Sequence, residues 1–281
     1  MRVRRSLAFE TQNPDVFGRT RIYRGRAVDV RRAGASARGR VHADFPQRAA
    51  ALAGAASHRR ADPGVPPTRG RNGHRSQLRP RHGSIDNLSA CVACAERIGL
   101  AGVVVHVGSG RGQPIDEAEV QVSSALEQVL SRSNDCPVLL ENSAGSGDTL
   151  GSRFQQIGAV FDRLGRDARL GLCLDTAHTF ASGYDLRADD GIQQAVDEID
   201  SHVGIERLKL IHANDSKVGL GSAVDRHENI GHGFLGDEAF RRMLAHHVLK
   251  GMPWVVEAPG YDGKGPDLQN VRDLKRLAGR G

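Results

Sequence analysis

The sequence lacks the features that would assign it to a membrane-bound, secreted or nucleotide-binding class. It contains no run of about 18 apolar residues, which excludes a membrane-spanning helix. Its start lacks the apolar core of a signal peptide, and its four cysteines are too few and too scattered for a disulfide scaffold. No GxGxxG motif follows the first predicted strand, and GxxxxGK(S/T) is absent. We therefore expect a cytoplasmic globular protein with no membrane partner.

Residues 1–83 lack lysine, yet they are strongly basic. They contain 19 arginines and 5 acidic residues, a net charge of +14. Residues 84–281 contain 20 basic and 28 acidic residues, a net charge of −8. An acidic body attracts polyanions poorly, so phosphate chemistry there would require bound cations that reverse the local charge.

Residues 1–83 also lack hydrophobic periodicity. They hold no run of four large apolar residues, and they are rich in arginine, alanine, glycine and proline. One interpretation is a disordered basic tail. The other, which we favour, is a segment translated out of frame, because GC-rich DNA over-produces these four residue types.

Residues 84–281 alternate between helical and strand patterns. A helix with Ser84 as its N-cap is predicted for residues 84–99, and Cys91 and Cys94 inside it are expected to be small buried residues. Further helices are predicted for residues 114–132, 152–165, 190–203, 237–248 and 266–278. Apolar strands are predicted for residues 102–108, 137–142, 170–176, 208–215 and 254–259. Five apolar strands that alternate with helices predict parallel βα units.

Each predicted strand carries one side chain of a metal-binding type near its C-terminal end. These residues are His106, Glu141, Asp175, His212 and Glu257. The C-terminal ends of barrel strands meet on the face where active sites are built. Charged groups at the ends of apolar strands cost several kcal/mol unless they are compensated, and we expect shared cations rather than an ion-pair network.

Three loop residues extend this set of ligands. His178 follows Asp175 by three residues, and Asp225 and His227 lie two apart on an extended loop, where both can face one ion. Nitrogen and oxygen ligands without cysteine suit zinc, although mixed clusters also admit manganese. Eight ligands exceed the needs of one tetrahedral ion, so two or three ions are predicted, with Glu141 or another carboxylate as a bridge. Clustered ions suit phosphoryl chemistry.

Four segments around these ligands carry a family resemblance. They are Leu140-Glu-Asn-Ser-Ala-Gly145, Leu174-Asp-Thr-Ala-His-Thr-Phe-Ala-Ser-Gly-Tyr-Asp185, His212-Ala-Asn-Asp-Ser-Lys217 and Val224-Asp-Arg-His-Glu-Asn-Ile-Gly-His-Gly233. They resemble the endonuclease IV family, whose members are apurinic/apyrimidinic endonucleases (deoxyribonuclease IV) of base-excision repair. Glu257-Ala-Pro-Gly260 is similar to the last ligand strand of that family.

The resemblance covers residues 84–281 and implies a TIM (β/α)8 barrel of the xylose-isomerase-like type with three zinc ions. It implies that Glu141 bridges two zincs as the catalytic residue and that His106 helps to hold the first. It assigns the second zinc to Asp175, His212 and Glu257, and the third to His178, Asp225 and His227. The implied activity is hydrolysis of the phosphodiester 5′ to abasic sites in double-stranded DNA, with trimming of blocked 3′ ends, by a monomer.

The sequence departs from the family pattern in residues 1–83. The first three βα units of the family belong there, and no counterpart is found, so one ligand of the first zinc has no match. Phe9-Glu-Thr-Gln-Asn-Pro14 resembles a family loop that enters DNA. Five strands cannot close an eight-stranded barrel. We therefore interpret the N-terminal units as missing or scrambled and expect weak or absent activity.

Two other functions are compatible with parts of the sequence. Sugar isomerases and epimerases with xylose-isomerase-like barrels resemble the quartet of Glu141, Asp175, His212 and Glu257, but they use a single divalent ion. A non-catalytic basic DNA-binding protein would instead bind through the arginine-rich arm, with a steep salt dependence. Loop residues on the predicted site face are either phosphate contacts or solvated charges, namely Arg111, Lys217, Arg226 and Lys264.

Overall fold

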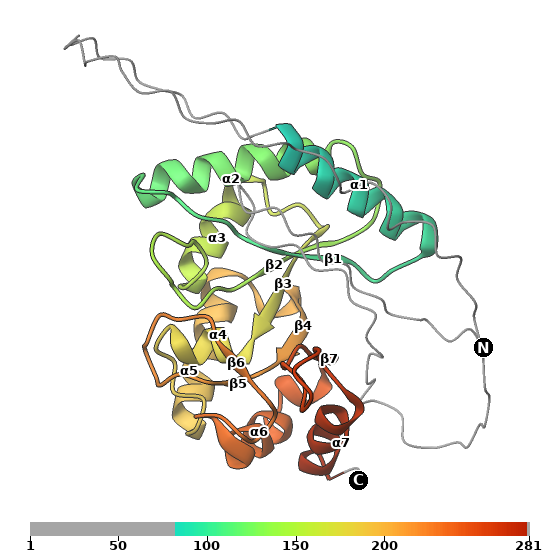
Figure 1. Cartoon of the computed structure of the whole chain (residues 1–281). Coiled ribbons are helices and arrows are strands. Elements are labelled where there is room, and N and C mark those ends of the chain that lie inside the picture. The colour runs from blue at the N-terminus through green and yellow to red at the C-terminus, as the bar shows by residue number, and fades with distance from the viewer. Residues whose placement is uncertain (1–81, 280–281) are drawn as a thin grey trace, which may run out of the picture. The chain divides into compact units, whose positions relative to one another are not determined.

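The computed structural model of the protein describes residues 82–279 (Figure 1). The interpretations given above for the preceding arginine-rich segment, a disordered tail or a frame error, lie outside the described residues. So does the DNA-entering loop expected at residues 9–14. The region 84–279 can be compared with its prediction element by element.

Five parallel strands form one sheet, as the sequence predicts. In spatial order they are β1 (Val103–His106), β2 (Val138–Glu141), β3 (Leu170–Asp175), β4 (Leu208–Ala213) and β7 (Trp254–Val256). Among residues 82–279 the sheet ends at β1 on one side and at β7 on the other. The described residues therefore supply five of the eight parallel strands of a (β/α)8 barrel.

Helices connect the strands near the predicted positions. They are α1 (His82–Ile98), α2 (Ile115–Leu130), α3 (Phe154–Arg163), α5 (Asp189–His202), α6 (Gly236–Ala245) and α7 (Leu268–Leu277). The prediction of Ser84 as an N-cap is wrong, because α1 begins two residues earlier and the buried Ser84 hydroxyl has no hydrogen-bond partner among the described residues. No helix in residues 82–279 is long and apolar enough to cross a membrane.

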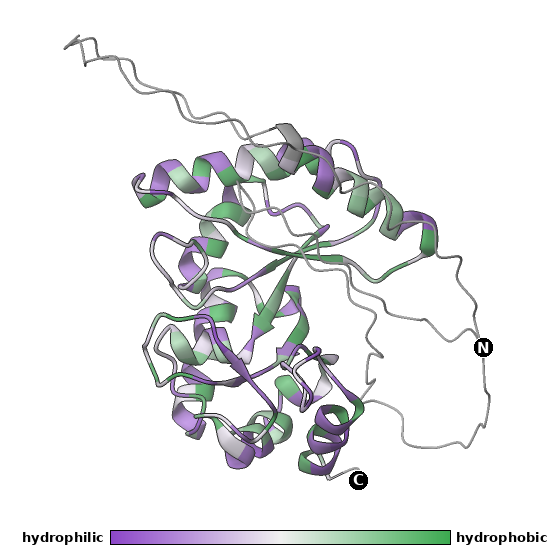
Figure 2. Ribbon diagram, in the orientation of Figure 1, coloured by the Kyte–Doolittle hydropathy of each residue, from purple (hydrophilic) through white to green (hydrophobic). Residues whose placement is uncertain are grey.

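Side chains alternate along each strand between two faces of the sheet. On the helix side, Leu140 and Leu172 belong to the main core together with Leu126 of α2 and Phe161 of α3. In Figure 2 the strands are coloured mainly as hydrophobic, which agrees with burial on both faces. On the opposite face, a smaller apolar cluster supports the polar strand ends above it and consists of Val104, Leu139, Cys173 and Leu210, with Val255 packed against them.

A β-bulge in β4 changes which residues face that second cluster. Leu208 pairs with Leu172, whereas Leu210 pairs with Cys173, so Lys209 is an extra residue in the ladder. Leu208 packs in the helix-side core and Leu210 in the opposite cluster. Beyond the bulge, His212 is paired with Asp175 and shares its face.

Two short features were not predicted from the sequence. Helix α4 (Thr176–Ala181) follows β3 directly, and the two-residue strands β5 (Asp215–Ser216) and β6 (His227–Glu228) form an antiparallel pair. Both are too short to produce a hydrophobic period. The expected burial of Cys91 and Cys94 is also wrong in degree, because both free thiols lie in half-buried residues of α1.

Candidate metal centre

The parallel register brings the five strand-end residues onto one face at one end of the sheet. His106 is paired with Glu141, and Asp175 is paired with His212. Glu257 follows the last residue of β7. Four of these residues are buried, whereas His106 is half-buried. The sequence-based expectation that strand ends collect these groups is confirmed as geometry.

Glu141 lies at the centre of the cluster. Its Oε2 is 3.5 Å from His106 Nε2, and its Oε1 is 2.8 Å from His212 Nδ1. The same Oε1 is 3.8 Å from His178 Nδ1. One buried carboxylate of β2 therefore contacts imidazoles on β1, β4 and α4, which is the position expected of a bridging ligand.

A second group lies beside Glu141 on β3, β4 and the end of β7. His212 Nδ1 is 3.1 Å from Glu257 Oε2. Candidate ligand atoms of Glu141, Asp175, His212 and Glu257 all lie within 4.8 Å of one another, and all four residues are buried. Three buried carboxylates around one imidazole form a strongly anionic set of oxygens, which a cation would stabilise.

The third group is a triangle formed by His178 of α4, Asp225 of the loop before β6, and His227 of β6. The Nε2 atoms of the two histidines are 3.3 Å apart. Asp225 Oδ1 is 3.1 Å from His178 Nε2 and 3.4 Å from His227 Nε2. A tetrahedral zinc with bonds of about 2.0–2.2 Å holds its ligand atoms about 3.3–3.6 Å apart. The three distances therefore fit ligands that face one zinc ion.

Hydrogen bonds orient the histidine at the apex of this triangle. His178 lies in α4, whose N-cap Asp175 accepts the His178 backbone N–H at 2.8 Å. His178 Nδ1 is 2.9 Å from the backbone oxygen of Asn142. With Nδ1 donating to that carbonyl, Nε2 is the ring nitrogen that faces Asp225 and His227, and it would offer its lone pair to a cation held between the three side chains.

The close packing of carboxylates and imidazoles determines which side chains of the cluster carry protons. Burial lowers the pKa of His178, but the charge of Asp175 and the contacts with Asp225 and Glu141 outweigh burial and raise the pKa to about 10. Burial raises the pKa of Glu141, but His106, His212 and His178 outweigh burial and hold that pKa below its usual range. Protons on buried imidazoles thus balance the carboxylates, and bound cations would take over that role.

Two asparagines support the cluster and were missed by the sequence analysis. Asn142 Oδ1 accepts the backbone N–H of Asp175 at 2.7 Å. Asn214 Nδ2 donates to Asp175 Oδ2 at 2.5 Å and to Glu257 Oε2 at 3.3 Å. Each asparagine comes one or two residues after a strand-end ligand, Glu141 or His212, which is the one signal in the sequence that could have identified them.

Asp215 is a further missed residue, and it fixes the loop that follows the cluster. Its Oδ1 accepts the backbone N–H groups of Ser216 and Leu235, and its Oδ2 accepts those of Gly233 and Gly236. The carboxylate is buried, so water cannot replace these bonds. It holds residues 233–236 against the start of β5.

Replacing Asp215 with Asn is expected to lower the free energy of unfolding by about 3 kcal/mol, because the amide group turns a donor toward two backbone donors. Urea denaturation measures this change. Asp200→Asn is the control, because exposed Asp200 accepts a single backbone N–H, from Ile205, and its loss should cost less than about 1 kcal/mol. Equal effects of the two substitutions would contradict the anchoring role.

Comparison with known proteins gives matches that share these elements. The family described as the xylose isomerase-like TIM barrel matches residues 51–278. The probable endonuclease 4 of Halothermothrix orenii is 36% identical over 194 residues, which cover 69% of this chain and 70% of the relative. That of Oleidesulfovibrio alaskensis is 44% identical over 188 residues, which cover 66% and 63%. The chain thus spans about two thirds of the length of these relatives.

A solved structure gives the same result. The crystal structure of endonuclease IV from Thermus thermophilus is 32% identical, with a TM-score of 0.58, and the match covers 70% of this chain and 69% of that one. The match to the family begins inside the arginine-rich segment, at residue 51.

Proposed function

The chain belongs to the endonuclease IV family of xylose isomerase-like TIM barrels, and from that premise we propose that it hydrolyses the phosphodiester 5′ to abasic sites in double-stranded DNA. The proposed cofactor is zinc, bound as two or three ions. The proposal includes trimming of blocked 3′ ends, a monomeric enzyme and action in the cytoplasm.

The triangle of His178, Asp225 and His227 carries this proposal. Its three donor atoms lie 3.1–3.4 Å apart. It lies next to the quartet that a single-ion isomerase would need, and it shares His178 contacts with Glu141 and Asp175. An enzyme that binds one cation has no use for these additional ligands, whereas phosphodiester hydrolysis benefits from several clustered cations.

The proposed ligand sets follow the three groups. His106 and Glu141 would hold the first ion, Glu141 together with Asp175, His212 and Glu257 would hold the second, and His178, Asp225 and His227 would hold a third. When bound, the ions would supply Lewis acidity toward a phosphate and lower the pKa of water. The protein orients these ligands, since Asn142 and Asn214 fix Asp175, and it buries five of them, namely Glu141, Asp175, His178, His212 and Glu257.

An abasic-site duplex assay combined with metal analysis tests the proposal. We expect the purified protein to contain two or three zinc ions, to nick the duplex 5′ to the lesion and to lose activity in a chelator, with recovery on addition of zinc. An undamaged duplex of the same sequence is the control substrate. About one manganese or magnesium ion without nicking would favour a sugar isomerase. DNA binding that persists in chelator without cleavage would favour a non-catalytic binding protein.

The rate of nicking is expected to be low. The described residues supply five strands, and β1 and β7 form the edges of their sheet. His106 lies at the β1 edge, and the first ion has His106 and Glu141 as its proposed ligands. At equal zinc content, the T. thermophilus endonuclease IV is therefore expected to nick the same duplex faster. Equal rates would contradict this expectation.

A further inference from the structure

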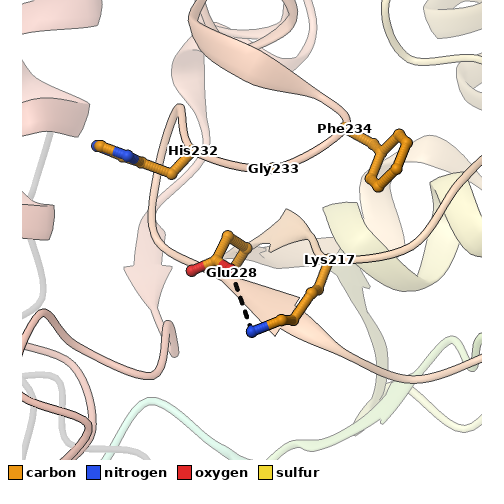
Figure 3. A pocket seen from close by; sticks show the side chains of 5 residues that line it. All are labelled: Lys217, Glu228, His232, Gly233 and Phe234. Carbon is orange, nitrogen blue, oxygen red and sulfur yellow. Dashed lines mark ion pairs between the residues drawn. The ribbon is translucent and has the colours of Figure 1, made fainter.

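A pocket separate from the metal cluster lies on the other face of the β5–β6 pair. It is lined by Lys217, Glu228, His232, Gly233 and Phe234 and has a volume of about 340 Å³. Figure 3 shows the loop of His232, Gly233 and Phe234 on one side of the opening and the ion pair of Glu228 and Lys217 on the other. We call it the Phe234 pocket.

The pairing of β5 with β6 places this pocket close to the proposed reaction centre. Ser216 is paired with His227, and Asp215 is paired with Glu228. Successive side chains of a strand point to opposite faces, so His227 points to the metal cluster while Glu228 points into the Phe234 pocket. One short strand therefore separates the two sites.

Phe234 is presented to solvent by a fixed backbone. The residue is 56% exposed, but its N–H donates to the Ser216 backbone oxygen at 2.8 Å. The neighbouring N–H groups of Gly233 and Leu235 donate to Asp215 at 2.9 Å. A Cβ atom at Gly233 would collide with the Ser216 backbone oxygen, so this close packing requires glycine. An exposed aromatic ring on a rigid loop loses little entropy when it binds a partner.

The His232 end of this same loop is also fixed. His232 Nε2 is 2.9 Å from the Tyr261 hydroxyl, and the two rings meet edge to face. The Tyr261 hydroxyl donates to Asp273 at 3.1 Å. The loop after β6 is thereby connected to the loop after β7 and to α7.

Exposed apolar side chains concentrate at this end of the sheet. Of the eight large apolar side chains that are exposed in the described region, six lie between the end of a strand and the first residue of the following helix. These six are Ile115, Leu220, Val224, Phe234, Tyr261 and Leu268. Phe234 is thus one of several exposed apolar side chains at the end of the sheet that holds the metal cluster.

We propose that the Phe234 pocket binds one nucleotide of the DNA strand, with the base stacked on Phe234 and the adjoining phosphate paired with Lys217. This inference rests on the proposed function. An exposed aromatic ring beside a lysine is the combination that nucleic-acid strands recognise, since every base has a stacking face and every phosphate a negative charge. Lys217 has an exposed side chain whose ammonium lies 3.5 Å from Glu228 Oε2, so the phosphate competes with that carboxylate.

The test is binding of a fluorescent abasic-site duplex whose scissile phosphate is replaced by a methylphosphonate, which prevents cleavage. Phe234→Ala is expected to weaken binding about tenfold, and Phe234→Trp is expected to retain it. Lys217→Ala should reduce the slope of log K against log salt by about 0.7–0.9, as expected for one lost phosphate contact. Glu228→Gln should tighten binding, because it removes the competing carboxylate.

Ile98→Ala is the matched control, because Ile98 is 52% exposed but lies at the end of α1, away from the loops that follow the strands. Unchanged affinity in Phe234→Ala and an unchanged salt slope in Lys217→Ala would overturn the proposal. The pocket would then be a candidate binding site for a protein partner. Because binding is read without cleavage, a wild type that binds but never nicks refutes the proposed function alone. A wild type that nicks while all variants bind normally refutes this inference alone.

Discussion

Replacing Glu141 with Gln is expected to lower the bound zinc by at least one ion and to reduce nicking of abasic DNA about 10²–10³-fold. Glu141 contacts three histidines, His106, His178 and His212, at 2.8–3.8 Å. The amide keeps the shape of the side chain but loses the negative charge and one acceptor oxygen. Metal analysis of the purified variant and single-turnover nicking measure the two effects.

Glu119→Gln is the matched control for this substitution. Glu119 is also a buried glutamate, but it lies in α2, and its carboxylate is 3.6 Å from Arg163. We expect this control to keep its zinc and its nicking rate. A Glu141→Gln protein with wild-type zinc content and rate would show that the carboxylate is structural, and the assignment of the bridge would then be wrong.

Removal of metal is expected to produce the largest change in stability. Glu141, Asp175 and Glu257 are buried within reach of one another, so the protein without cations must balance them with protons on histidine. Each ion at about 1,000 times its dissociation constant contributes about 4 kcal/mol to the free energy of unfolding. Loss of one ion should therefore lower Tm by about 10 °C.

Thermal denaturation with and without chelator measures this change. Added zinc should restore Tm, with a rise that follows the logarithm of the free zinc concentration, whereas added magnesium should not, because imidazole-rich sites favour zinc. The variant His227→Ala offers an internal check, since it removes one vertex of the triangle and should reduce the response to zinc. A Tm that changes neither with chelator nor with added zinc would contradict cation binding at these residues.

The strand ends could be predicted because parallel topology makes their position follow from the sequence alone. Once residues 170–176 and 208–215 are recognised as neighbouring parallel strands, Asp175 and His212 must lie at the same end of the sheet. The structure pairs them directly. The same logic covers His106, Glu141 and Glu257, the spacing of His178, Asp225 and His227 added these three candidates, and the family resemblance assigned them to one zinc.

What could not be predicted depends on contacts between residues distant in the sequence. Asp215 reads as an ordinary loop carboxylate, and its four backbone partners include three that lie about 20 residues away. Helix α4 is stabilised at its start by the N-cap Asp175. Its six residues are too few to show a helical period in the sequence. The half-exposure of Cys91 and Cys94 likewise depends on what packs against α1, not on the helical period that places them.

The extra residue at Lys209 has a consequence for how this protein tolerates change. Leu208 and Leu210 already lie opposite the successive residues Leu172 and Cys173, so deleting Lys209 would remove the bulge and leave His212 opposite Asp175. Deleting Ile211 with the bulge retained would instead turn His212 to the helix side, because a slip of one residue moves the later side chains of a strand to its other face. Strand β4 should therefore tolerate the loss of one residue at Lys209 far better than the loss of one residue next to His212.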